Sequence, residues 1–390
     1  MLTFRSALKH VVFARRVNVA LQTWRMRARY ENTRKRYMGA ALTGVNESWR
    51  ARAGVIIELW SGACMRVFVL GADEQQDKSG FLQALQARAG VRCFTRDDGA
   101  WGQNDPIPYA ERLGRNTSRL EALFESNAAE GWVPHVLIGQ TWGCLVEPAC
   151  FSRLREKYGV FVINVTMDDR HQYWGNKVNG QWDGTFPLIP HIDLTLTAAP
   201  EAVHWYRCEG GAALYFPEAS DASIFCPRPE LPKLHDVSFV GSRYGIRAEV
   251  VEALSKAGVN VVAYGSGWEA GRLATEAVPT LFAQSKIVLG VSAIGHSRDF
   301  VGLKLRDFDA PLTGSCYLTQ YNRDLESLYR LGEEIVTYRS VADCVAQVRA
   351  LLADPSRLAA IGAAGRERAL RDHTWSKRLN DMFAALPDHP

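Results

Sequence analysis

Short apolar segments that end abruptly in polar residues recur along this chain of 390 residues. In the first half these segments are "MRVFVLGAD", "VRCFTRDD", "HVLIGQTW" and "VFVINVTMDD", and a helical stretch at residues 79–89 separates the first two. Such alternation of strand and helix builds a parallel sheet with helices on both faces, so we predict a doubly wound α/β domain. Ligands of such domains bind at the carboxyl ends of the strands.

The same alternation restarts after a segment with four prolines between residues 217 and 232, which we interpret as a linker. The later strand-like runs are "DVSFVGS", "VNVVAYGSG", "KIVLGVS", "SCYLT" and "EIVTY", followed by helical stretches at 341–353, 355–371 and 374–385. A chain of this length exceeds one ordinary hydrophobic core. We therefore predict an α/β protein in which two Rossmann-like domains face each other across a cleft, with an N-terminal helical arm.

The predicted domain limits follow from these patterns. They are a basic helical arm at 1–64, an N-terminal Rossmann-like domain at 65–225, a C-terminal Rossmann-like domain at 233–372 and a helix at 373–390. For the last helix, packing back on the N-terminal domain is one option.

Positive charge is concentrated in the arm. Residues 1–52 contain twelve Lys and Arg against only Glu31 and Glu47, although the net charge of the whole chain is +4. Apolar residues at 13, 17, 21, 24 and 28 form one helical face among the arginines, and a second helix is expected from about Asn46. Such a helix can lie on an anionic membrane surface, bind a partner enzyme or a sister subunit, or pack on its own body. Nucleic acid is not an expected partner, because no reader motif accompanies the charge.

The compartment is expected to be the cytoplasm. No apolar run approaches the ~18–20 residues that span a bilayer, and Arg15 and Arg16 interrupt the only apolar stretch near the N-terminus. The eight cysteines are scattered without metal-ligand spacing, which is typical of reduced thiols. Peripheral attachment at the inner membrane face is the option that the arm leaves open.

The second half carries the groups that a nucleotide diphosphate requires. Such a ligand favours glycine-rich turns at helix N-termini together with fixed cations. The candidate donor-binding residues are Gly241, Ser242, Arg243, Arg247, Gly265, Lys304, Arg306, Phe308, Asp309 and Gly314.

The triplet "DFD" at 307–309 also spells a metal-binding D-x-D motif. If it lies on a helix, Asp307 and Asp309 point about 200° apart at ~100° per residue, so they would not share one cation. We therefore expect no metal, and we assign the ligand-facing role to Asp309.

The order "VSFVGS…R…AYGSGW…KIVLGVS…LRDFDAPLTGSCYLT…LGEEIVTY…HTWSKRL" resembles the CgeB-like (spore maturation protein-like) glycosyltransferases, a group 1-type family with the GT-B fold. Upstream, "MDDRHQYWG" and "DLTLTAAPEAVHWYRCEGGAALYFPEAS" resemble the N-terminal half of that family, so the resemblance covers about 66–380. It implies a nucleotide-sugar donor in the C-terminal domain and an acceptor in the N-terminal domain.

Particular residues match the family pattern. Phe308-Asp309 stands where the family usually has Phe-Glu, the acid expected at the donor ribose, and Gly314, Arg306, Gly241 and Arg247 match neighbouring family positions. Two positions depart from the family pattern. Asp is one methylene shorter than Glu, and Val301 stands where related retaining enzymes carry a second Glu.

The turn "TMDDRH" is the predicted source of the catalytic base. Asp168, Asp169 and His171 follow a strand that we expect to end near Thr166, and a carboxylate or imidazole there could accept the proton of an acceptor hydroxyl. The predicted acceptor-binding residues are Asp73, Gln140, Trp142, Tyr173 and Trp174.

The leading hypothesis is a hexosyltransferase-type glycosyltransferase of glycan biosynthesis that needs no metal and no cofactor. Its expected substrates are a UDP-sugar and a saccharide, lipid-linked or protein acceptor. Two alternatives remain: a nucleotide-sugar epimerase on the same fold, and a catalytically silent nucleotide- or sugar-binding scaffold. An NAD-dependent dehydrogenase is disfavoured, because no G-x-G-x-x-G follows the first strand at Leu70.

Overall fold

The computed structural model describes residues 2–43, 47–72, 74, 80–105, 107–178 and 180–386, except for the side chains of residues 2–18 and 47. The chain divides into two compact units. The N-terminal unit comprises Tyr37–Ile224 and Arg371–Pro390, and the C-terminal unit comprises Met1–Arg36 and Phe225–Leu370. The first 36 residues therefore group with the second Rossmann-like half, whereas the sequence predicted a separate arm ending at residue 64.

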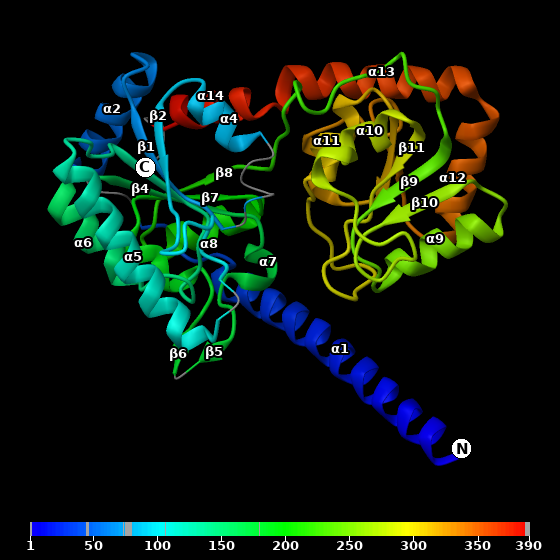
Figure 1. Ribbon diagram of the computed structural model, residues 1–390, viewed down its shortest axis with the longest axis horizontal. Coiled ribbons are helices and arrows are strands. Elements are labelled where there is room, and N and C mark those ends of the chain that lie inside the picture. Colours follow the sequence, from blue (N-terminus) through cyan, green and yellow to red (C-terminus); the bar gives the residue numbers. More distant parts are fainter. Residues whose placement is uncertain are drawn as a thin grey trace. The chain divides into compact units, whose positions relative to one another are not determined.

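The N-terminal unit is built on a six-stranded parallel sheet with the order β2-β1-β3-β4-β7-β8 (Figure 1). Its strands are β1 (Arg66–Leu70), β2 (Gly90–Cys93), β3 (Val136–Gly139), β4 (Phe161–Thr166), β7 (Leu194–Thr197) and β8 (Ala213–Tyr215). Helices cover both faces of such a sheet, and β3 and β4 are accordingly buried along their whole length.

The helices of this unit connect consecutive strands or pack on them. They are α2 (Glu47–Ser61), α4 (Phe81–Gln86), α5 (Tyr109–Ala129), α6 (Pro148–Tyr158), α7 (Asp169–Gln172), α8 (Pro200–Cys208) and α14 (Trp375–Ala384), with the 3-10 helix η1 (Phe186–His191). A two-stranded antiparallel hairpin, β5 (Lys177–Val178) with β6 (Gln181–Trp182), follows α7. α14 returns to this unit, where Phe383 stacks on Trp60 of α2 with ring centroids 4.2 Å apart.

The C-terminal unit contains a five-stranded parallel sheet with the order β10-β9-β11-β12-β13. Its strands are β9 (His235–Val240), β10 (Val261–Tyr264), β11 (Ser285–Leu289), β12 (Cys316–Gln320) and β13 (Val336–Tyr338). Its helices are α1 (Leu2–Tyr37), α9 (Ile246–Lys256), α10 (Val278–Ala283), α11 (Arg306–Leu312), α12 (Val341–Ala353) and α13 (Pro355–Asp372), with η2 (Thr275–Ala277) and η3 (Arg323–Ser327). The last residue of α1, Tyr37, and the last two of α13, Arg371 and Asp372, belong to the N-terminal unit. The predicted α/β class with parallel sheets is confirmed.

α1 packs on its own unit through a face that the sequence did not predict. Arg27 Nη1 donates to both carboxylate oxygens of Asp299, at 2.7 and 2.8 Å, and the centroid of the Tyr30 ring lies 5.2 Å from that of Phe300. The predicted apolar face points elsewhere, since Leu21 is 46% and Trp24 is 65% exposed. The side chains of residues 13 and 17, which complete that face in the sequence, lie outside the described residues.

Candidate functional site

Two glycine turns meet at the carboxyl ends of β9 and β10. Gly241 and Gly265 both have positive φ angles, 154° and 136°, and a Cβ atom at Gly265 would lie 2.3 Å from the Gly241 carbonyl oxygen. That approach excludes any side chain at position 265. The Trp268 indole donates a hydrogen bond to the same carbonyl at 2.7 Å, which holds the first turn in place.

Two guanidinium groups converge on the Gly241 turn. Arg247 lies in the first turn of α9, and Arg306 is the first residue of α11. A Cβ atom at Gly241 would meet Arg306 Nη2 at 3.0 Å and Arg247 Nη1 at 3.4 Å. Both guanidinium groups lie over the Phe239 ring, at 5.1 Å for Arg306 and 6.0 Å for Arg247. Burial lowers the pKa of Arg247, and the neighbouring charge of Arg306 also lowers it.

The charge of this arginine pair is not balanced by acidic groups. Arg306 donates to the Val240 carbonyl and Arg247 to the Ser242 carbonyl, and neither makes an ion pair within 4.0 Å among the described residues. Arg306 Nη1 and Arg247 Nε are buried without a hydrogen-bond partner in the described part of the chain. Buried cations without counter-ions are costly, so this arrangement indicates a site for an anionic ligand.

The other predicted donor-binding residues surround this pair in different ways. Ser242 is exposed, Lys304 is half-buried and Gly314 has a φ of 73° after α11. The Arg243 guanidinium pairs with Glu252 at 2.6 Å, which already neutralises its charge. Phe308 is completely buried as part of the core, so its predicted contact with a ligand gains no support from its position and stays a prediction.

The two aspartates of the "DFD" triplet have different surroundings. Asp307 is fully buried and accepts hydrogen bonds from the Tyr317 hydroxyl at 2.6 Å and the Lys304 amide at 2.7 Å, and burial raises its pKa. Its carboxylate therefore fastens α11 to β12. Asp309 is 7% exposed on the same short helix. Val301 lies between β11 and α11, where its backbone bridges to Ala293.

In the N-terminal unit, β4 ends at Thr166 as predicted, and the three candidate catalytic residues follow it. The carboxylate of Asp168 is 41% exposed and lies 3.7 Å from Nε2 of His171. Asp169 is only 1% exposed, and its carboxylate accepts hydrogen bonds from Thr166, Thr185, Thr197 and Tyr206. This geometry gives Asp169 a structural role in place of the predicted catalytic one, and leaves Asp168 with His171.

The predicted acceptor-binding residues are only partly brought together. Gln140 and Trp142 are half-buried directly after β3. Tyr173 is 2% exposed and sits among the rings of Trp205 and Tyr206, so its predicted contact with an acceptor stays a prediction. The Trp174 ring is tilted against that of Phe186, with centroids 4.1 Å apart, and lies 5.4 Å from the Trp182 ring of the hairpin. Asp73 lies outside the described residues.

A cavity of about 820 Å³ lies next to these residues. It is bordered by Gly143, the hairpin residues Gln181 and Trp182, and an acidic pair, Glu121 and Glu147, that Arg153 bridges at 2.8 and 3.0 Å. None of the acceptor-binding residues predicted from the sequence lines this cavity. Glu121 lies on α5 and Glu147 directly precedes α6, and nothing in the sequence links them.

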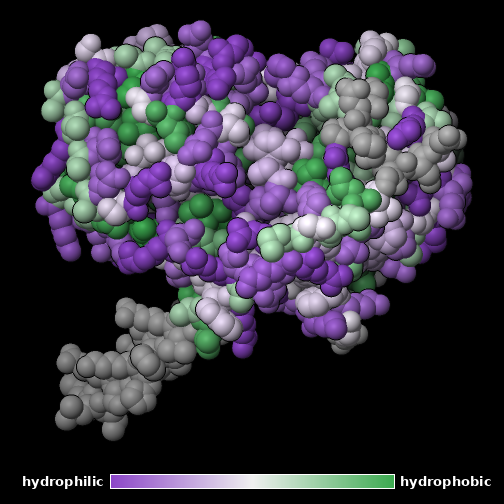
Figure 2. Space-filling model, turned by 180° about the vertical axis from the view of Figure 1, so that it is seen from behind, coloured by the Kyte–Doolittle hydropathy of each residue, from purple (hydrophilic) through white to green (hydrophobic). Residues whose placement is uncertain are grey.

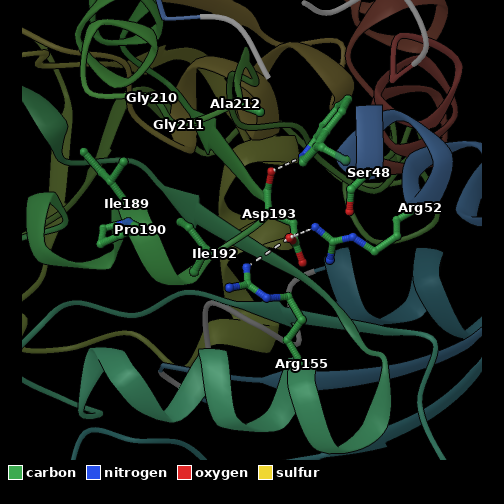
Figure 3. Close-up of a pocket in the computed structure, with 11 residues that line it drawn as sticks. Ser48, Arg52, Arg155, Ile189, Pro190, Ile192, Asp193, Gly210, Gly211 and Ala212 are labelled. Atoms are coloured by element: carbon green, nitrogen blue, oxygen red, sulfur yellow. Dashed lines mark hydrogen bonds and ion pairs between the residues drawn. The ribbon is translucent and has the colours of Figure 1, made fainter. Parts of the chain in front are cut away.

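A second pocket, of about 550 Å³, lies at the opposite edge of the same sheet (Figure 3). Arg52 and Arg155 both point at Asp193, at 2.6 and 3.2 Å, and Asp193 immediately precedes β7. The other Asp193 oxygen accepts the Val162 amide at 2.8 Å. This pocket is therefore at the amino-terminal ends of the strands, and its arginines hold α2 and α6 to the sheet.

Hydrophilic residues cover most of the face shown in Figure 2, with hydrophobic residues between them in small groups. Among the described residues, no helix has the length and hydropathy required to cross a bilayer. The same residues contain no group of three or more His, Cys, Asp or Glu side chains that could hold a metal ion.

Residues 247–384 match a family model described as glycosyl transferase-like. A search of curated protein sequences finds no significant match. The chain is similar in structure to a sucrose-phosphate synthase from Thermosynechococcus elongatus, with a TM-score of 0.61 and 12% identity over 83% of this chain and 98% of that one.

Of two further similar structures, one is a complex with UDP and glucose and the other is a glycosyltransferase. Anabaena HepE in complex with UDP and glucose gives a TM-score of 0.58 at 12% identity, over 82% of this chain and 100% of that one. AviGT4, a glycosyltransferase of avilamycin A biosynthesis, gives 0.53 at 16% identity, over 83% and 98%. At these identities the likeness shows the fold, which is that of GT-B glycosyltransferases. It does not distinguish the CgeB-like subfamily, which stays a prediction.

Proposed function

We propose that this protein is a glycosyltransferase that moves a sugar from a nucleotide-diphosphate sugar to an acceptor hydroxyl. The observation that carries the proposal is the arginine pair at the Gly241 turn, in which Arg247 Nε and Arg306 Nη1 are each buried without a hydrogen-bond partner among the described residues. Both arginines lie within the region that matches the glycosyl transferase-like model. Arginine forms paired hydrogen bonds with phosphate oxygens, and two arginines together suit a diphosphate.

The arginine pair also fits the chemistry of transfer. When the bond between the anomeric carbon and the diphosphate breaks, negative charge develops on the departing phosphate oxygen. Fixed cations aimed at that oxygen stabilise the transition state, because they need no reorganisation during the reaction. Arg247 and Arg306 would supply this stabilisation, so the proposed reaction needs no metal ion.

We assign the donor as a UDP-sugar, with Asp309 accepting hydrogen bonds from the ribose hydroxyls. The UDP and glucose bound by the structurally similar HepE support this donor class. On the acceptor side, Asp168 is the proposed base that receives the hydroxyl proton, with His171 beside it. A saccharide, a lipid-linked saccharide and a protein are all compatible acceptors for a hexosyltransferase of glycan biosynthesis.

Calorimetric titration with UDP tests the donor site. Arg247→Ala and Arg306→Ala each remove charge-assisted hydrogen bonds worth about 1.5–3 kcal/mol, so UDP affinity should fall roughly 10- to 150-fold. Arg330→Ala is a matched control, since Arg330 is an exposed arginine of the same unit that pairs with Glu334. Unchanged affinity in both site variants would refute the assignment.

Activity assays separate the proposed function from its alternatives. A transferase should release UDP faster when its acceptor is present, whereas an epimerase should change the sugar nucleotide with no acceptor. UDP binding without either reaction, across saccharide, lipid-linked and protein acceptors, would favour a silent binding protein.

A further inference from the structure

Exposed apolar side chains are concentrated near the start of the chain. The large hydrophobic residues that are exposed in the described part of the molecule are Leu21, Trp24, Met38, Leu42, Val55, Leu234 and Leu370. Five of these seven precede residue 56, in the region where basic residues outnumber acidic ones most strongly. Isolated exposed leucines are ordinary, but a tryptophan that is 65% exposed among them is not.

Two of these residues, Leu21 and Trp24, are on α1, on the side of the helix that faces away from the C-terminal unit. The docked face contains Thr23, whose hydroxyl accepts the His296 amide at 3.2 Å, and Tyr30, which packs on Phe300. At ~100° per residue, the outward stripe of Leu21, Trp24 and Ala28 is centred roughly 160° from the face around Thr23, Met26 and Tyr30. The Arg27–Asp299 ion pair adds to the contacts of Thr23 and Tyr30, and in this docked orientation the stripe stays on the outward side.

The charges beside the stripe define what can cover it. Arg25 and Lys35 are exposed on the same outward half of α1. Apolar side chains bordered by lysine and arginine suit the boundary between lipid headgroups and acyl chains, where tryptophan is favoured and anionic headgroups attract the cations. A second copy of the same basic surface would repel the first.

We propose that α1 is a membrane-surface helix whose stripe of Leu21, Trp24 and Ala28 inserts at the interface of an anionic lipid bilayer. This proposal is independent of the proposed function, because the stripe contains none of the candidate donor-binding, acceptor-binding or catalytic residues. It implies a protein that works at a lipid surface without crossing it.

Co-sedimentation of the full chain with lipid vesicles tests the proposal. The wild type should bind phosphatidylcholine vesicles that contain phosphatidylglycerol and should bind pure phosphatidylcholine much more weakly. Added salt should weaken the binding, because it screens the attraction between the basic residues and the headgroups. The variant Leu21→Glu/Trp24→Glu should lose roughly tenfold or more of its partitioning into the anionic vesicles.

The matched control is Leu234→Glu/Leu370→Glu, which charges two exposed leucines of the same unit, 50% and 36% exposed, outside α1. It should bind vesicles like the wild type. Failure of the wild type to bind anionic vesicles, or equal binding by the stripe variant, overturns the proposal. A wild-type dimer in analytical ultracentrifugation that the stripe variant dissociates would also overturn it, since the stripe would then be a subunit interface. UDP titration of the stripe variant shows separately whether the donor site is intact.

Discussion

Removing the carboxylate of Asp169 should destabilise the N-terminal unit severely. Its oxygens lie 3.0, 2.9 and 2.5 Å from the hydroxyls of Thr166, Thr185 and Thr197, and 2.7 Å from that of Tyr206. In Asp169→Ala these buried hydroxyls lose their acceptor, and each orphaned donor costs about 1–3 kcal/mol.

Rotation of the hydroxyls recovers part of that loss, because the Tyr206 and Thr185 oxygens are themselves 2.7 Å apart. We therefore expect a net loss of about 3–5 kcal/mol, as when one partner of a buried polar network is deleted. For a unit of this size that is a fall in melting temperature of roughly 6–20 °C. Asp169→Asn keeps one acceptor oxygen and should lose clearly less.

The same residue makes a prediction about pH. Burial raises the pKa of Asp169 above that of the unfolded chain, so the folded state binds its proton more tightly. Its contribution to stability is therefore complete below the unfolded pKa of about 3.9 and is lost as pH rises through the raised value. Asp169→Asn, which cannot ionise, should lack this part of the pH dependence.

Thermal melts at several pH values, followed by fluorescence, measure both effects. UDP titration serves as the control, because the arginine pair belongs to the other unit and should keep its affinity. The reasoning is refuted if Asp169→Ala melts within about 2 °C of the wild type, the shift expected from less than ~1 kcal/mol. A stable Asp169→Asn that binds UDP but has lost transfer would return Asp169 to a catalytic role.

Three further predictions concern the two candidate sites. Asp168→Asn should slow transfer roughly 10²-fold or more while UDP affinity is unchanged, and His171→Ala should slow it less; full turnover in both, measured by UDP release, would place the base elsewhere. Gly265→Ala should weaken UDP binding in titrations, because its Cβ would lie 2.3 Å from the Gly241 oxygen, whereas Gly258→Ala, with nothing within 4 Å, controls for the loss of a positive-φ glycine. Transfer should persist in excess EDTA, and a loss that added Mg²⁺ restores would contradict a reaction carried by the arginine pair alone.

The architecture was predictable because its signal is local. Central parallel strands such as β3 and β4 are buried on both faces and therefore read as continuous apolar runs, and the polar residue that ends each run marks the edge where ligands bind. This is why the end of β4 at Thr166 and the turns at Gly241 and Gly265 could be located in advance.

The roles of adjacent side chains were not predictable, because they depend on residues distant in the chain. Asp168 and Asp169 are equivalent in the sequence, and only the hydroxyls of Thr185, Thr197 and Tyr206, brought in by later elements, decide which one is buried. Similarly, Phe308 matches a family position in sequence, yet the short α11 turns it into the core.

The helical spacing of α1 located its apolar stripe but could not show what that stripe faces. α1 docks through Thr23, Met26 and Tyr30, a mixed set that carries little hydrophobic signal.

The return of α14 to the N-terminal unit has a consequence for how the protein forms during synthesis. Phe383 stacks on Trp60, Asn380 accepts the Trp60 indole N–H at 3.1 Å, and Trp375 packs against Phe81. A ribosome therefore completes the whole C-terminal unit before it supplies the helix that covers α2 and α4. Until α14 has been synthesised, these aromatic surfaces are exposed to solvent and the N-terminal unit is incomplete. At that stage we expect the nascent chain to bind chaperones.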